Sequence, residues 1–162
     1  MTQDVQIRLD RMRYTKDKMS ANLVLLAIVL DALYFISIYQ TDVGTYYYTW
    51  VIGASIVYNL LFMLMAFLAS EGVKNRKNGY TALLIFIGLL QIVRIFYLPA
   101  KAHGAEVIIN EISHDVMSDG QYIYTIACLA LSGICCVIAA ITSSINNKKL
   151  AEYMRSLENT AV

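Results

Sequence analysis

The chain has 162 residues, of which 58% are hydrophobic and 15% are charged, and its formal net charge at pH 7 is +1. A soluble domain is about half apolar and about one quarter charged, so this composition excludes a soluble globular enzyme, a disordered chain and a secreted disulfide scaffold. The near-zero charge also excludes a nucleic-acid partner, because binding to a polyanion requires an excess of basic residues. With a mean hydropathy of +0.54, the sequence is typical of a protein embedded in lipid.

The apolar residues are concentrated in four blocks. A helix needs roughly 20 residues to cross a hydrocarbon core of about 30 Å, and each block is about that long. The blocks are rich in leucine and alanine and do not alternate, which favours helices over the strands of a barrel. We therefore predict an all-α integral membrane protein whose first partner is the lipid bilayer. Its four spans are expected at residues 21–39, 49–70, 80–98 and 122–145.

The basic residues predict the orientation of these spans. The segment before the first span, the second connection and the segment after the fourth span hold all but two of the 13 basic residues, Arg94 and Lys101 being the exceptions. Connections rich in lysine and arginine stay on the cytoplasmic side of a membrane. Both termini are therefore predicted to be cytoplasmic. The sequence has no N-glycosylation sequon and no organelle signal, which favours a bacterial cytoplasmic membrane.

The lengths of the connections predict how the spans are arranged. The first and second connections have about nine residues each, and such short connections join antiparallel neighbours. The predicted architecture is therefore an antiparallel four-helix transmembrane bundle. In the longer third connection, apolar residues recur at helical spacing, which predicts a short amphipathic helix at about 104–117 on the outer surface. Segments 1–20 and 146–162 are predicted to be helical and cytoplasmic.

Four polar side chains lie inside the predicted spans: Asp31, Asn59, Gln91 and Arg94. A charge in the middle of a membrane costs several kcal/mol, so such a side chain is expected to face protein and to have a partner. Asp31 and Arg94 reach a similar depth, because the long Arg94 side chain points back toward the start of its helix. Three interpretations stay open. The four form an internal salt bridge and hydrogen-bond network, or one charge faces a partner subunit, or they line an ion path, a proton path or a polar ligand site.

Small residues recur every four positions along one stripe of the fourth span: Cys128, Ser132, Cys136, Ala140 and Ser144. Small side chains at this spacing let helix backbones approach closely. The stripe therefore predicts tight helix packing, either within the bundle or against another protein. The three cysteines of the chain all lie in this span, and we interpret them as packing residues.

The third connection also holds a group of potential metal ligands: His103, Glu106, Glu111, His114 and Asp115. Two histidines with scattered carboxylates are more typical of a solvated face than of a metal centre. No metal site and no cofactor are predicted.

The sequence has no phosphate-binding loop, dinucleotide fingerprint, zinc-protease motif or nucleophile elbow, and its connections are too short for a separate catalytic domain. It is therefore predicted not to be an enzyme. The first hypothesis is an accessory or scaffolding subunit of a larger membrane complex such as a transporter, which binds other membrane subunits or itself. The alternative is a small homo-oligomeric channel or transporter, in which the four intramembrane polar residues line the pathway.

Overall fold

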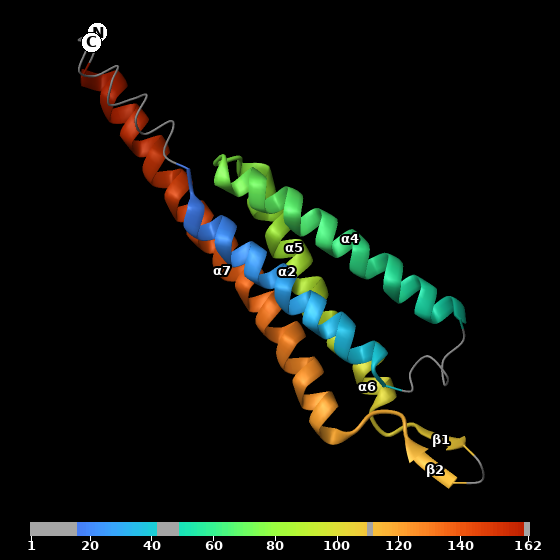
Figure 1. Ribbon diagram of the computed structural model, residues 1–162. Helices are drawn as coiled ribbons and strands as arrows, with labels where there is room; N and C mark the ends of the chain where they lie inside the picture. Colours follow the sequence, from blue (N-terminus) through green and yellow to red (C-terminus); the bar gives the residue numbers. More distant parts are fainter. Residues whose placement is uncertain (1–15, 42–48, 110–111, 161–162) are drawn as a thin grey trace.

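The computed structural model describes residues 16–41, 49–109 and 112–160 (Figure 1). The structure is mostly helical (83%). Four of its helices are long and apolar enough to cross a membrane. The predicted segment 1–20 lies outside the described residues up to residue 15.

The four long helices are α2 (Lys18–Tyr39), α4 (Thr49–Lys74), α5 (Asn78–Ile95) and α7 (Asp119–Thr160). Each contains most or all of one predicted span. The third predicted span, 80–98, continues past the end of α5, because the chain leaves α5 after Ile95 and continues in the short helix α6 (Leu98–Ala102). The stretch Asn78–Ala102, which contains this predicted span, is long and apolar enough to cross a membrane. Pro99 stands in the first turn of α6, where a proline is tolerated because its missing N–H has no helical partner.

The third connection contains a β-hairpin, so the prediction of an amphipathic helix at about 104–117 was wrong. Strands β1 (Glu106–Ile109) and β2 (Ile112–Asp115) pair antiparallel, with Val107 opposite His114. Two physical reasons explain the difference. Gly104 has a φ of +89°, which stops the preceding helix. The apolar residues that follow are β-branched, and these favour an extended chain over a helix.

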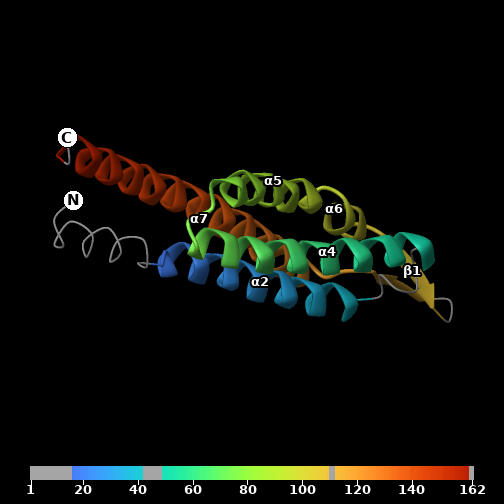
Figure 2. The same ribbon diagram turned by 90° about the horizontal axis from the view of Figure 1, so that it is seen from above.

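Helix α7 is the central element of the fold. It packs against both α2 and α5, while α4 packs against α2 and, less extensively, against α5 (Figures 1 and 2). The helix runs without interruption from the fourth predicted span into the predicted tail, so residues 146–160 are helical as expected. Residues 161 and 162 of that tail lie outside the described part of the chain.

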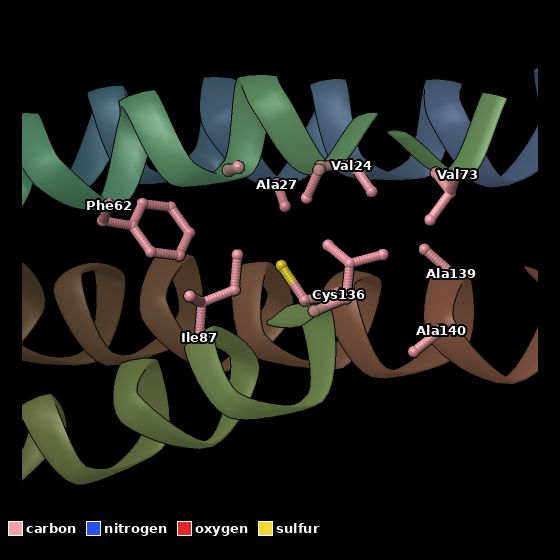
Figure 3. Packing of buried hydrophobic residues seen from close by; sticks show 11 residues of the cluster. Val24, Ala27, Phe62, Val73, Ile87, Cys136, Ala139 and Ala140 are labelled. Atoms are coloured by element: carbon pink, nitrogen blue, oxygen red, sulfur yellow. The ribbon is translucent and has the colours of Figure 1, made fainter. Parts of the chain in front are cut away.

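Two buried apolar clusters hold the helices together. In the larger cluster, side chains of α2 and α4 point toward those of α5 and α7 (Figure 3). Its members include Val24, Ala27, Phe62, Val73, Ile87, Cys136, Ala139 and Ala140. The second cluster joins the ends of α2 and α7 to α6 and to the segment after the hairpin. It consists of Tyr34, Ile38, Leu98, Ala102, Val116, Met117, Cys128 and Leu129.

Asp17 ties three helices together at the opposite end of the bundle. Its carboxylate caps α2 by accepting hydrogen bonds from the backbone N–H (3.2 Å) and the hydroxyl (2.8 Å) of Ser20. It also accepts a 3.0 Å hydrogen bond from the Asn146 amide on α7. The Asp17 N–H donates to the carbonyl of Lys74, the last residue of α4. The sequence places Asp17 in the segment before the first predicted span, and its side chain is buried.

Helices α5 and α7 cross at two glycines. A Cβ atom built on Gly133 would lie 3.0 Å from the backbone oxygen of Gly88, and one built on Gly88 would lie 3.1 Å from the backbone oxygen of Gly133. These distances are shorter than ordinary Cβ contacts, so the helices can approach this closely because neither residue has a side chain. The crossing lies about one helical turn before Gln91 along α5, because Gln91 follows Gly88 by three positions on the same face.

Candidate functional site

The four predicted intramembrane polar residues lie together in one cluster between three helices. Asp31 comes from α2, Asn59 from α4, and Gln91 and Arg94 from α5. The Arg94 guanidinium donates one hydrogen bond to Asp31 Oδ1 (3.0 Å) and another to Asn59 Oδ1 (2.8 Å). The Gln91 amide donates to the same Asp31 oxygen at 2.8 Å. The chain therefore supplies partners for its own intramembrane charges.

The cluster is enclosed by protein. Asp31 and Gln91 have no exposed surface, and Arg94 retains 7% of its own. Because both side chains are almost completely buried, the attraction between the Arg94 guanidinium and the Asp31 carboxylate is stronger than at a surface. The same enclosure makes the pair costly to break, since a single remaining charge would have neither solvent nor a counter-ion.

Two tyrosine rings flank the Arg94 guanidinium. Its central carbon lies 4.3 Å from the ring centroid of Tyr34 on α2 and 4.8 Å from that of Tyr58 on α4. Both distances are in the range in which an aromatic face attracts a cation. Tyr34 follows Asp31 by three positions and therefore lies on the same face of α2. Sequence reasoning missed Tyr58, for which the available signal was its position directly before Asn59.

Two acceptor atoms of the cluster have no hydrogen-bond partner within the described residues. They are Asp31 Oδ2 and Gln91 Oε1, and both are buried. An unsatisfied buried acceptor costs about 1–3 kcal/mol. The cluster can therefore accept two further hydrogen bonds from a donor that reaches it.

A cavity of about 270 Å³ lies between α4 and α5 and adjoins Arg94. Its lining residues come from α4, α5, the link between α5 and α6, and the start of α6, and they are Ala54, Ser55, Tyr58, Leu90, Val93, Arg94, Tyr97 and Leu98. The two long helices are close at the turn that connects them and diverge away from that turn (Figure 1). The cavity occupies the region of divergence and opens on one side.

The predicted stripe of small residues faces the interior of the chain. Cys128, Ser132, Cys136 and Ala140 are buried, and the Ser132 hydroxyl donates a 2.9 Å hydrogen bond to the carbonyl of Ala27 on α2. The fifth member, Ser144, is partly exposed. The buried residue in this turn of α7 is the neighbouring Ser143, whose hydroxyl lies 3.4 Å from that of Thr81 on α5.

The potential metal ligands of the third connection are not gathered into one site. His103 contacts Asp119 (3.0 Å) and stacks on the Tyr122 ring, with the ring centroids 4.0 Å apart. Glu106 accepts a hydrogen bond from Ser113 across the hairpin. Among the residues that the structure describes, no three His, Cys, Asp or Glu side chains form a group that could hold a metal ion. Glu111 lies outside the described residues.

The cluster combines a paired cation and anion, amide groups and aromatic faces. These groups are suited to binding a ligand or a partner side chain and holding it in position. No protein-family model, curated protein sequence or solved structure matches the chain.

Proposed function

We propose that the chain is a non-enzymatic accessory or scaffolding subunit of a larger integral membrane complex. We expect this complex to be a transporter. The observation that carries the proposal is the outward face of α4. This helix is the least enclosed of the four, with 22% of its most apolar segment buried compared with 44% for α7. It also exposes large apolar side chains along most of its length.

The exposed side chains of α4 have the spacing that a partner helix requires. Val57, Leu60, Leu64 and Phe67 follow one another at intervals of three, four and three residues, and their exposed fractions are 54% to 60%. This is the alternation with which left-handed helix pairs interdigitate, both in water and in membranes. We define these four residues as the α4 stripe. A single helix of another subunit packed along α4 would contact all of them.

The supporting experiment compares two faces of the molecule. Replacing Leu60 and Leu64 together by alanine is expected to release a stoichiometric partner subunit during purification in a mild detergent, because the contact loses two central side chains. The matched control replaces Ile138 and Ile141 on α7, which are 45% and 53% exposed, and should retain the partner. A native chain that runs as an 18.2 kDa monomer with no companion subunit would contradict the proposal.

The proposed arrangement in the membrane is an antiparallel four-helix bundle with both termini inside a bacterial cytoplasmic membrane. The basic residues of the second connection and of the α7 extension support this orientation. Cysteine labelling tests it. In intact cells, a membrane-impermeant maleimide should label a His114→Cys variant, whose site is in the exposed hairpin, and should not label Lys149→Cys. The reverse pattern would invert the topology, and the parent chain is the control because its cysteines lie within a span.

The alternative function is a small homo-oligomeric channel or transporter with a polar pathway. The unpartnered Asp31 Oδ2 and Gln91 Oε1 favour it, since they could receive hydrogen bonds from a permeating species. Flux into proteoliposomes that contain this chain alone is the test. Flux in wild type that is lost in Gln91→Leu would support the pathway, whereas an impermeable vesicle in every ion gradient would exclude it.

A further inference from the structure

The cavity between α4 and α5 has apolar walls and one strongly polar group. Ala54 on α4 and Leu90 and Val93 on α5 supply apolar lining, while Arg94 is the charged residue of the lining. A concave apolar site with a few convergent polar groups is the usual form of a small-molecule site. The volume of about 270 Å³ is sufficient for a ring-sized group.

Arg94 has donors to spare. A guanidinium carries five N–H groups, and two of them are used in the bonds to Asp31 and Asn59. These two bonds and the flanking rings of Tyr34 and Tyr58 fix the position of the guanidinium. A group held so firmly offers its remaining N–H groups to an acceptor without the entropic cost of ordering a long side chain.

The charge of the site favours an uncharged occupant. Asp31 already neutralises Arg94 at 3.0 Å. An anionic ligand would have to lose its hydration and would also meet the Asp31 carboxylate close by, both of which oppose binding. A neutral carbonyl oxygen accepts hydrogen bonds from the guanidinium without either cost.

The depth of the site favours a molecule that dissolves in the hydrocarbon. Asp31 is about 12 Å from the nearer end of α2, at about 1.5 Å per residue. In the proposed orientation, this places Arg94 within the hydrocarbon layer, whereas phospholipid ester groups lie at its boundary. We propose that the cavity binds an uncharged lipophilic molecule whose carbonyl oxygen accepts a hydrogen bond from Arg94, as the ring of a lipid quinone would. This binding is independent of any partner subunit.

Trp50 provides a reporter for the test. It is the single tryptophan of the chain and lies one helical turn before Ala54 on the same face of α4. The purified chain in phosphatidylcholine nanodiscs is titrated with a fully substituted benzoquinone that carries a decyl chain. We expect saturable quenching of Trp50 fluorescence. Decylbenzene, which keeps the decyl chain on a six-membered ring but has no carbonyl, should displace the quinone and restore Trp50 fluorescence only with a dissociation constant at least about tenfold larger than that of the quinone.

Two variants fill the cavity from opposite walls. Ala54→Phe on α4 and Leu90→Phe on α5 should each weaken quinone binding by about tenfold or more, because the added ring occupies the site. Leu68→Phe is the matched control, since residue 68 is on α4 and 50% exposed but neither lines the cavity nor belongs to the α4 stripe, and quinone binding to this variant should be unchanged. Circular dichroism verifies that each variant is folded, and either filling variant alone is sufficient for the comparison.

Three results would overturn the proposal. The first is unsaturable quenching, or saturable quenching that is equal in wild type and in a folded filling variant, which would mean that the quinone does not enter this cavity. The second is displacement of the quinone by decylbenzene with a dissociation constant equal to that of the quinone, which would remove the role of Arg94. The third is saturable quenching by a phosphatidylcholine with brominated acyl chains, reversed by unbrominated phosphatidylcholine and unaffected by the quinone, which would identify a phospholipid site.

Discussion

Replacing Arg94 by glutamine is expected to lower the free energy of unfolding by about 3–5 kcal/mol, because the change leaves the Asp31 carboxylate buried without a counter-ion. The loss of one neutral hydrogen bond would cost about 0.5–1.5 kcal/mol, so the charge accounts for most of the effect. Asp31→Asn should be destabilising in the same way, since it isolates the guanidinium. The measurement is unfolding in mixed micelles with increasing SDS, followed by circular dichroism.

The double variant decides whether the two side chains act as a pair. Asp31→Asn combined with Arg94→Gln should recover part of the lost stability, because no buried charge is left unpaired. Lys77→Gln is the control for removal of a positive charge, and this exposed residue should change stability by less than about 0.5 kcal/mol. Strictly additive losses in the double variant would show that the contact between Asp31 and Arg94 contributes nothing to stability.

The second large effect is expected at the crossing of α5 and α7. Gly133→Leu should destabilise the protein by about 3 kcal/mol, because the new side chain must displace the backbone of α5 at Gly88. The displacement also moves Gln91, whose Cβ lies 3.6 Å from the position of the added atom. The effects of Gly133→Leu and Arg94→Gln are therefore expected to be non-additive.

Gly120→Leu is the matched control on the same helix. A Cβ built on Gly120 meets no atom within 4 Å, and leucine favours a helix over glycine, so this change should be neutral or slightly stabilising. Equal unfolding midpoints for Gly133→Leu and wild type would show that the close approach of the two helices is not needed for stability.

The spans could be predicted from the sequence because a bilayer imposes a length and an apolar composition on any helix that crosses it. The cluster could be predicted for a related reason. A charge is so costly in lipid that Asp31 and Arg94 had to meet a partner, and their depths left each other as the simplest one. Composition and helical rise were sufficient for these parts of the structure.

Other features depend on contacts that the sequence pattern does not encode. The hairpin residues fit both a helical and an extended reading, and the deciding factors were the β-branched side chains and the turn at Gly104. Asp17 was missed because its partners Lys74 and Asn146 are far away in the sequence. The cavity beside Arg94 was missed because it arises from the angle between two helices, and the apolar faces of α4 and α5 gave no signal of that angle.

The uninterrupted course of α7 has a mechanical consequence. No glycine or proline occurs between Gly133 and its last residue, Thr160, so this length of helix has no built-in hinge. The 15 residues after Ile145 extend it by about 22 Å, at 1.5 Å per residue. A tilt of about 10° at the crossing with α5 would therefore sweep the far end of the rod sideways by about 7 Å over the roughly 40 Å from Gly133 to Thr160. A small change of helix packing at this crossing would thus become a larger displacement of any molecule that contacts the C-terminal end of α7.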